Sequence, residues 1–170
     1  MKKVSLLVLL ALFSMSASVW SQTPTTVCSG TDTTTYSPGL RLFVRTTDVA
    51  WTDDYPDCVS STPGIDSASS PGGGYTTETS CLNLVSNDPV DGSQRIDWSN
   101  DEYSIFSWDA EDVIIVGSVV TVNATVTEGL FLGQPLIKIL VIPAPNLTTC
   151  LTEPGFTESS GPLTLMVLPL

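Results

Sequence analysis

Apolar residues recur at every second position along the most regular stretches of the chain, and this pattern restricts the fold more than any other feature. The clearest run is VIIVGSVVTVNATVTEG, residues 113–129. One face of it carries Ile114, Val116, Val120, Val122, Ala124 and Val126, while the opposite face becomes polar toward the C-terminal half. Successive side chains of a strand point to opposite faces, so this run predicts a half-buried strand. Because the same period dominates the later chain, we expect an all-β domain.

Shorter runs of the same kind are separated by clusters of Gly, Pro, Asn and Asp. They predict further strands at residues 31–36, 40–47, 75–85, 94–98, 103–108, 136–142 and 163–168. Gly117 and Ser118 interrupt the longest run, where a bulge or bend would turn the strand between two sheets or around a barrel corner. The expected architecture is one domain over residues 22–170, either a β-sandwich (immunoglobulin-like or jelly-roll-like) or a partly open barrel.

The first 21 residues have the pattern of a secretory signal peptide. Lys2 and Lys3 precede an apolar run over residues 4–13, and small and polar residues follow it. The run is shorter than the roughly 20 apolar residues that a membrane-spanning helix needs. We expect cleavage near Ser21, or alternatively after Ser18, and a mature chain without a transmembrane anchor. The lysine-rich start favours a bacterial protein, secreted to the periplasm or the exterior.

Four cysteines remain after the expected cleavage. In an oxidising compartment an even count predicts two disulfides, for which three connectivities exist. We expect Cys58 to pair with Cys81, closing a short loop, and Cys28 to pair with Cys150, joining the two ends of the domain. Between the first pair lies SSTPGIDSASSPGGGY, residues 60–75, whose composition predicts a flexible surface loop, with ligand binding as the alternative.

Charge and histidine content exclude several classes of function. The chain has 18 acidic and 6 basic residues, a formal net charge of −12. Such a surface repels phosphate backbones, so we expect no nucleic-acid partner. The chain has no histidine, which excludes serine and cysteine triads that use an imidazole base and disfavours a zinc site. An enzymatic activity is therefore less expected than a binding or structural role.

Acidic and aromatic residues alternate in RIDWSNDEYSIFSW, residues 95–108, which predicts a hairpin. Carboxylates beside aromatic rings suit a sugar-binding face, and a carboxylate pair is also what a glycosidase uses. The candidate ligand-binding residues are Asp97, Trp98, Asp101, Glu102 and Trp108. Neighbouring residues on a strand point to opposite faces, so Asp97 and Trp98 cannot act on one surface. The alternative is a solvated hairpin with buried aromatic residues.

Calcium is the one cofactor that the acidic residues leave open, because it prefers oxygen ligands. Residues 87–92 imitate the start of an EF-hand loop, but Pro89 occupies a ligand position and Trp98 stands where the bidentate glutamate belongs. An irregular site made of Asp53, Asp54 and Asp57, or one within residues 97–112, stays open.

Two further segments are expected to be structural. In TDTTTYSPGLRLFVR, residues 31–45, Pro38 and Gly39 satisfy the two central positions of a type II turn between two strands. The chain ends on LTLMVLPL, residues 163–170, which predicts a buried last strand. The alternative is an edge that pairs with a partner by strand addition.

Several segments together resemble a group of small secreted bacterial proteins of unassigned function. A GTxTxTYxPGL segment opens the domain at residues 30–40, and a CLTxPG segment at residues 150–155 precedes the final strand. The resemblance extends to the four cysteines and implies a secreted all-β domain. Its motifs are turns, strands and cysteines, so it implies no catalytic residues. We expect a binding, surface or structural module, with a carbohydrate-binding or carbohydrate-active protein as the alternative and an extracellular glycan or protein as partner.

Overall fold

A computed structural model describes residue 23, residues 25–84 and residues 89–170. These residues form nine strands, a single 3-10 turn and one short helix. The elements are β1 (Thr26–Leu40), β2 (Arg45–Ser60), β3 (Ala68–Thr79), β4 (Gly92–Trp98), β5 (Tyr103–Trp108), η1 (Ala110–Asp112), β6 (Val113–Val116), β7 (Val119–Gly129), β8 (Pro135–Val141), α1 (Leu147–Leu151) and β9 (Phe156–Val167). The predicted all-β domain is confirmed. The expected signal peptide lies outside the described residues.

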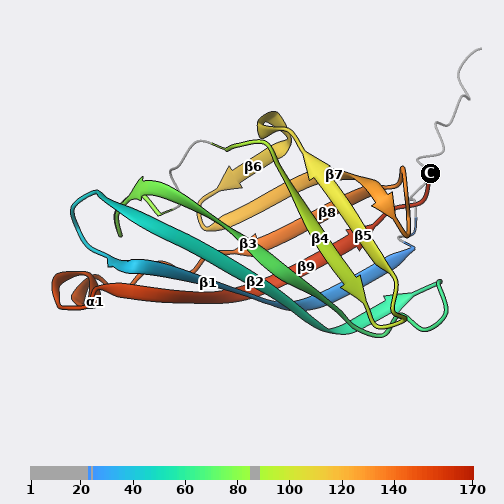
Figure 1. The fold of residues 1–170 in the computed structure, drawn as a ribbon, viewed down its shortest axis with the longest axis horizontal. Coiled ribbons are helices and arrows are strands. Elements are labelled where there is room, and N and C mark those ends of the chain that lie inside the picture. The colour runs from blue at the N-terminus through green and yellow to red at the C-terminus, as the bar shows by residue number, and fades with distance from the viewer. Residues whose placement is uncertain (1–22, 24, 85–88) are drawn as a thin grey trace, which may run out of the picture.

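The strands form one antiparallel sheet that closes into an eight-stranded barrel (Figure 1). Its order is β5-β4-β3-β2-β1-β9-β8-β7, and β5 pairs with β7 to complete the circle. β5 and β6 both pair with β7, at different parts of its length. β5 pairs with residues from Thr125 to Gly129, and β6 pairs with residues from Val119 to Val122. Of the two expected architectures, the strand pairing gives the barrel, and a two-sheet sandwich is not confirmed.

The barrel wall is incomplete between β3 and β4. These strands pair only through Ala68 with Trp98 and through Ser69 with Asp97. Beyond these pairs β3 continues along β2 and β4 continues along β5, so the two strands separate. The result is a lateral gap in an otherwise closed wall.

Apolar side chains fill the two ends of the barrel. The larger cluster includes Tyr55, Ile96, Phe106, Leu136 and Leu165, each at most 1% exposed. Each such side chain stabilises the fold by roughly 1.5–3 kcal/mol through burial. A smaller cluster, made of Tyr36, Leu40, Val49, Cys81 and Cys150, closes the end next to α1. The interior between the clusters carries polar residues and a cavity.

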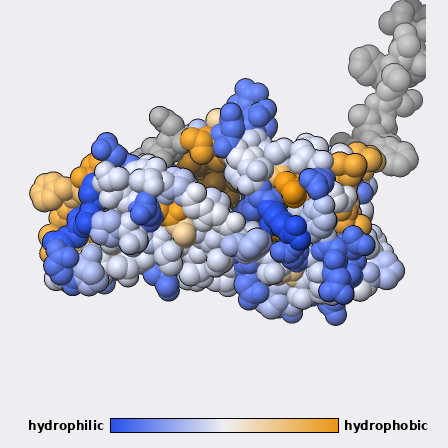
Figure 2. Space-filling model, viewed as in Figure 1, coloured by the Kyte–Doolittle hydropathy of each residue, from blue (hydrophilic) through white to orange (hydrophobic). Residues whose placement is uncertain are grey.

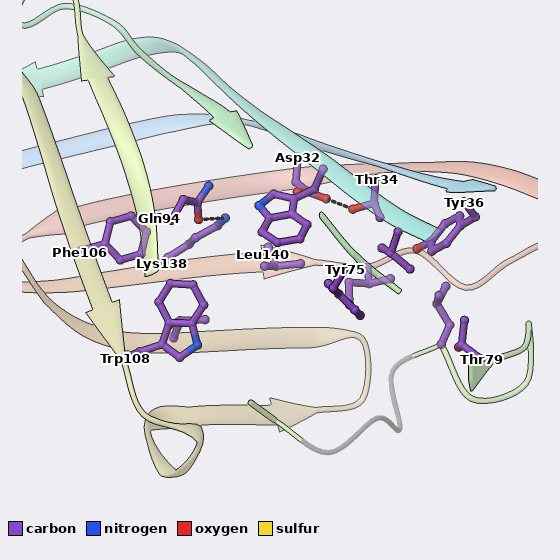
Figure 3. Close-up of a pocket in the computed structure, with 15 residues that line it drawn as sticks. Asp32, Thr34, Tyr36, Tyr75, Thr79, Gln94, Phe106, Trp108, Lys138 and Leu140 are labelled. Carbon is purple, nitrogen blue, oxygen red and sulfur yellow. Dashed lines mark hydrogen bonds between the residues drawn. The ribbon is translucent and has the colours of Figure 1, made fainter. Parts of the chain in front are cut away.

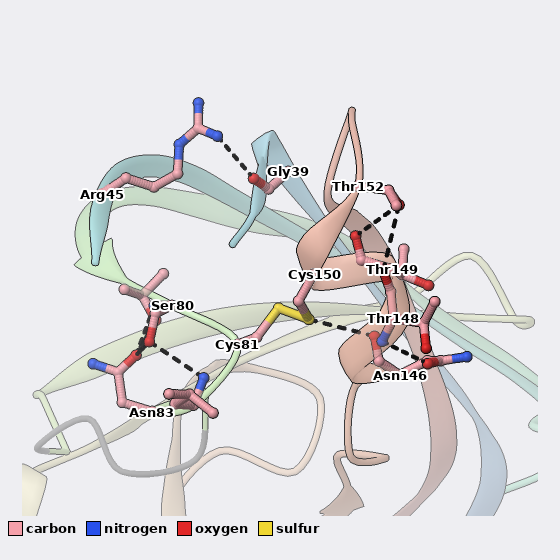
Figure 4. The surroundings of a disulfide bond; sticks show 12 residues. Gly39, Arg45, Ser80, Cys81, Asn83, Asn146, Thr148, Thr149, Cys150 and Thr152 are labelled. Atoms are coloured by element: carbon pink, nitrogen blue, oxygen red, sulfur yellow. Dashed lines mark hydrogen bonds between the residues drawn. A yellow bond between two sulfur atoms is a disulfide. The ribbon is translucent and has the colours of Figure 1, made fainter. Parts of the chain in front are cut away.

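The two disulfides are confirmed in number, but the expected pairing is wrong. Cys28 bonds to Cys58, and Cys81 bonds to Cys150. Cys28 and Cys58 are direct partners in the register of β1 and β2, with their Cα atoms 4.1 Å apart. The second disulfide joins the segment after β3 to α1 (Figure 4). The register of β1 and β2 decided the first pair, and the position of α1 beside the segment after β3 decided the second; sequence spacing shows neither.

The expected turn at residues 37–40 is also wrong. β1 continues through Leu40, which pairs with Phe156 of β9, and the chain reverses afterwards at residues 41–44. The predicted loop over residues 60–75 is too long, because β3 already begins at Ala68. Ser, Pro and Gly dominate the start of β3. This part of the strand pairs with β2 through its backbone, but its sequence lacks the alternation of apolar and polar side chains that predicts a strand.

Two expectations about strands are confirmed. The hairpin over residues 95–108 is formed by β4 and β5. The final strand is buried, since Leu163, Leu165 and Val167 are at most 2% exposed.

The single strand expected over residues 113–129 is wrong. The chain reverses at Gly117, which has a φ of 61° that glycine adopts without strain, and β6 pairs back onto β7. Because of this reversal, Ile114 and Val116 do not share the buried face of Val120 and Val122, and they are 52% and 72% exposed.

Candidate functional site

A cavity made of two adjacent chambers with shared walls occupies the barrel next to the smaller apolar cluster. The inner chamber has a volume of about 210 Å³. The outer chamber has a volume of about 390 Å³ and lies toward the gap, because Gly74 and Tyr75 of β3 and Gly92 and Ser93 of β4 line it. Both chambers are lined by Trp51, Tyr75, Leu84, Trp108, Val122 and Ile142. Figure 2 shows an apolar hollow on this side of the molecule.

Two tryptophans form the aromatic walls, and each lies over a glycine of the adjacent strand. Trp51 is the register partner of Gly73, and Trp108 is the register partner of Gly92. A Cβ atom on Gly73 would lie 2.7 Å from the Trp51 ring, and one on Gly92 would lie 2.3 Å from the Trp108 ring. Real Cβ atoms do not approach so closely, so the missing side chains create the space for both indoles.

Other aromatic rings extend these walls. The Trp51 and Tyr75 ring centroids are 6.0 Å apart, and those of Phe106 and Trp108 are 5.6 Å apart. The Trp108 indole N–H donates to the Val90 carbonyl at 3.0 Å, which fixes the orientation of the ring. The cavity is therefore apolar and largely preformed, as small-molecule sites usually are.

A buried polar layer forms the floor of the inner chamber, where Gln94 and Lys138 line it. Lys138 Nζ lies 2.6 Å from Asp53 Oδ2 and 3.0 Å from Gln94 Oε1. Gln94 Nε2 donates to Asp53 Oδ2 at 2.6 Å and to Ser70 Oγ at 2.8 Å. The Tyr55 hydroxyl also donates to Asp53 Oδ2, at 3.3 Å. Side chains from four strands thus form one hydrogen-bond network. Such partners offset the free-energy cost of burying the charges of Asp53 and Lys138.

Asp32 adjoins this layer and lines the inner chamber. It is the register partner of Asp53 on β1, is 7% exposed and accepts a hydrogen bond from Thr34 at 2.9 Å. Burial raises the pKa of its carboxyl to about 6, and the charge of Asp53 acts in the same direction, while Thr34 and Lys138 oppose it. Figure 3 places Gln94, Lys138 and Phe106 toward one end of the cavity and Tyr36 and Thr79 toward the other.

Two cavity tyrosines stay protonated around neutral pH. Burial raises the pKa of Tyr36 above its ordinary value. Burial also raises the pKa of Tyr75, which lies on the gap side of the cavity. Both hydroxyls therefore act as neutral hydrogen-bonding groups.

The structure does not bring the five sequence-predicted ligand residues together. Asp97 forms an ion pair with Arg95 at 2.6 Å on the outer face of β4. Trp98 points into the barrel, is 3% exposed and donates to Ser104 at 2.9 Å. Asp101 and Glu102 are exposed in the turn between β4 and β5. Trp108 alone of the five lines the cavity.

The outer face of the hairpin also carries Tyr103, whose ring is covered. The Arg95 guanidinium lies 4.4 Å from its centroid, and the Tyr103 hydroxyl donates to Glu128 at 2.5 Å. A sugar ring stacking on the face of Tyr103 that Arg95 covers would have to displace the guanidinium. The hairpin therefore presents a closed polar network.

The aspartates considered for calcium diverge. Asp53 points into the barrel and binds Lys138, whereas Asp54 and Asp57 are exposed. Within residues 25–84 and 89–170, no three His, Cys, Asp or Glu side chains are grouped to hold a metal ion.

Sequence reasoning missed most of the residues that line the cavity. One signal was available in LIKIL, residues 136–140, where Lys138 shares its strand face with Leu136 and Leu140. A lone lysine on an apolar face indicates a buried partner of opposite charge. Its partner Asp53 carries no comparable signal, because Asp53 lies in a run of acidic and polar residues.

No protein-family model, curated protein or solved structure matches the chain. The resemblance to small secreted bacterial proteins therefore stays an expectation. Within the described part of the chain, no helix has the length and apolarity to cross a membrane.

Proposed function

We propose that the protein is a secreted binding protein that holds a small, mainly apolar molecule inside its barrel. The observation that carries this proposal is the aromatic cavity behind the gap between β3 and β4. The two chambers together fall in the size range of ligand pockets, about 300–1,000 Å³. The two disulfides are consistent with an extracellular location.

The distribution of polar groups supports binding rather than catalysis. Asp53 is held by Lys138, Gln94 and Tyr55, so it is committed to the interior network. The cavity walls offer mainly aromatic and aliphatic surface, and the charged groups of the inner chamber are Asp32 and Lys138. Such an arrangement holds a molecule by apolar burial and orients it by a few polar contacts.

The alternative of a carbohydrate-binding hairpin receives less support from the geometry. Its tryptophans face the interior, and Tyr103 is covered by Arg95. The aromatic walls of the cavity favour the interior site.

A cavity-filling variant tests the proposal. Val122 is 7% exposed and lines both chambers, so Val122→Phe should place a ring in the cavity. The unsubstituted protein is titrated with the neutral fluorophore N-phenyl-1-naphthylamine, whose emission rises in apolar surroundings. We expect saturable binding to the unsubstituted protein and at least tenfold weaker binding to Val122→Phe.

Val119→Phe is the matched control. Val119 lies on the same strand, is 37% exposed and lines neither chamber, so the same change there should leave binding unaltered. Circular dichroism verifies that both variants fold. Absence of saturable binding to the unsubstituted protein, or equal binding by Val122→Phe, would refute the proposed function.

A further inference from the structure

The floor of the inner chamber carries more negative than positive charge. Asp32 and Asp53 are register partners on β1 and β2, and Lys138 is the cation that reaches Asp53, at 2.6 Å. Two carboxylates therefore share one ammonium group in an interior where charges are weakly screened. A ligand with one positive charge would neutralise the remaining negative charge of the two carboxylates.

Lys138 is already committed to the protein. Its ammonium donates to Asp53 Oδ2 and to Gln94 Oε1, at 2.6 and 3.0 Å. The other carboxylate oxygen, Asp53 Oδ1, is buried and has no hydrogen-bond partner among the described residues. Such unpaired buried oxygens are rare, and this one adds negative potential beside Asp32.

Asp32 is the acidic group of this floor that a ligand can contact. It lines the inner chamber, whereas Asp53 does not. Among the described residues its hydrogen-bond donor is Thr34, at 2.9 Å, which leaves acceptor capacity for a ligand. Trp51, Tyr75 and Trp108 line the same cavity, and the faces of such rings attract cations.

We propose that the cavity selects small apolar amines, with Asp32 as the residue that binds the ligand's ammonium group. This inference rests on the ligand-binding function proposed above. The ammonium forms a charge-assisted hydrogen bond to the Asp32 carboxylate, and the apolar part of the ligand packs between the indoles of Trp51 and Trp108.

The same geometry disfavours other head groups. A carboxylate ligand would add a third negative charge to a layer that contains one lysine. An alcohol can donate a hydrogen bond to the Asp32 carboxylate, but it brings no positive charge to offset the two carboxylates. The expected order of affinity is therefore amine, then alcohol, then carboxylate.

Amine binding should weaken in acid, because a protonated Asp32 no longer attracts a cation. The titratable groups that face Asp32 are Asp53 and Tyr55 of β2, Lys138 of β8 and Tyr36 of β1. The pKa of Asp32 is raised to about 6, so its charge is present above that pH and is lost below it. Amine affinity should fall as the pH is lowered through about 6, up to about tenfold per pH unit.

The experiment displaces N-phenyl-1-naphthylamine with three ligands of similar shape: 2-phenylethylamine, 2-phenylethanol and phenylacetate. At neutral pH we expect the amine to compete at least tenfold better than the alcohol and phenylacetate to compete least. Asp32→Asn should remove the preference for the amine and leave competition by the alcohol unchanged. Asp54→Asn, an equal charge change on the exposed face of β2, should behave like the unsubstituted protein.

Each outcome separates the two proposals. If the neutral fluorophore binds but the alcohol competes as well as the amine, or Asp32→Asn keeps the amine preference, the amine inference is wrong and the binding function stands. If the fluorophore does not bind, the proposed function fails, and calorimetric titration with 2-phenylethylamine then tests the amine directly. No heat of binding in that titration would also overturn the inference.

Discussion

Asp32 and Asp53 are register partners in one layer of the barrel, but their partners differ. The Oδ2 oxygen of Asp53 accepts hydrogen bonds from Lys138, Gln94 and Tyr55, and the side chain is fully buried. The Asp32 carboxylate accepts a hydrogen bond from Thr34 and lines the cavity. A buried carboxylate without a cation of its own costs free energy, so Asp32 is retained at the expense of stability.

This cost predicts the pH dependence of stability. The pKa of Asp32 is raised from 3.8 to about 6 in the folded protein, so the folded state binds the proton more tightly than the unfolded chain. The free energy of unfolding should therefore fall as the pH rises from about 4 to about 6, with a contribution of the order of 2 kcal/mol.

Asp32→Asn isolates this contribution. The variant should be more stable than the unsubstituted protein at about pH 7.5, and the two should converge near about pH 4.5. Urea unfolding at both pH values measures the difference. A variant that is destabilised equally at both pH values would contradict the argument.

At the scale of elements, neighbouring strands place an indole over a glycine twice. Trp51 of β2 covers Gly73 of β3, and Trp108 of β5 covers Gly92 of β4. Both glycines lie beside the gap, where β3 and β4 have separated. The rings thus shield glycine backbone at the edge of the gap and also form the walls of the cavity.

Gly92→Ala tests this packing. The added Cβ would lie 2.3 Å from the Trp108 ring, so the ring must move. We expect a loss of about 1–3 kcal/mol in the free energy of unfolding, the usual cost of overpacking.

A double-mutant cycle provides the control. In a Trp108→Ala background the alanine at position 92 meets no indole, so its additional cost should be within about 0.5 kcal/mol of zero. An equal cost in both backgrounds would show that the backbone at Gly92, rather than the ring, resists the side chain.

At the scale of the whole molecule, the barrel is held closed by hydrogen bonds between paired strands and by two disulfides that span different lengths of sequence. Cys28–Cys58 joins adjacent strands and spans 30 residues of sequence. Cys81–Cys150 spans 69 residues and fastens α1 over the end of the barrel that contains the smaller apolar cluster. The second bond connects segments that no strand pairing joins directly.

Replacing Cys81 and Cys150 by alanine should lower the free energy of unfolding by about 4 kcal/mol on the chain-entropy estimate. Non-reducing peptide mapping of the unsubstituted protein should yield one peptide pair containing Cys28 and Cys58 and another containing Cys81 and Cys150. Urea unfolding of the double variant then measures the cost. Recovery of a peptide pair joining Cys58 to Cys81 would contradict the fold.

Local features were predictable because they depend on neighbouring residues. The strands of the 95–108 hairpin follow from alternation and a polar connection. A break in the run over residues 113–129 follows from Gly117, but alternation alone did not show that the chain reverses there. Which residues of distant strands lie side by side in the barrel was not predictable, because this depends on the register between those strands. Leu40 illustrates this, since its pairing with Phe156 extends β1 past Pro38 and Gly39.

The sequence by itself determined an all-β chain, an acidic surface, two disulfides and the exclusion of imidazole chemistry. Period-two patterning and residue counts are sufficient for these, since they need no knowledge of distant contacts. Tertiary structure decided the closure into a barrel, the cysteine pairing and the cavity. Asp32, Asp53, Gln94 and Lys138 are separated by up to 106 residues and meet only because four strands adopt one register. A site built across strands is therefore visible only after the sheet has closed.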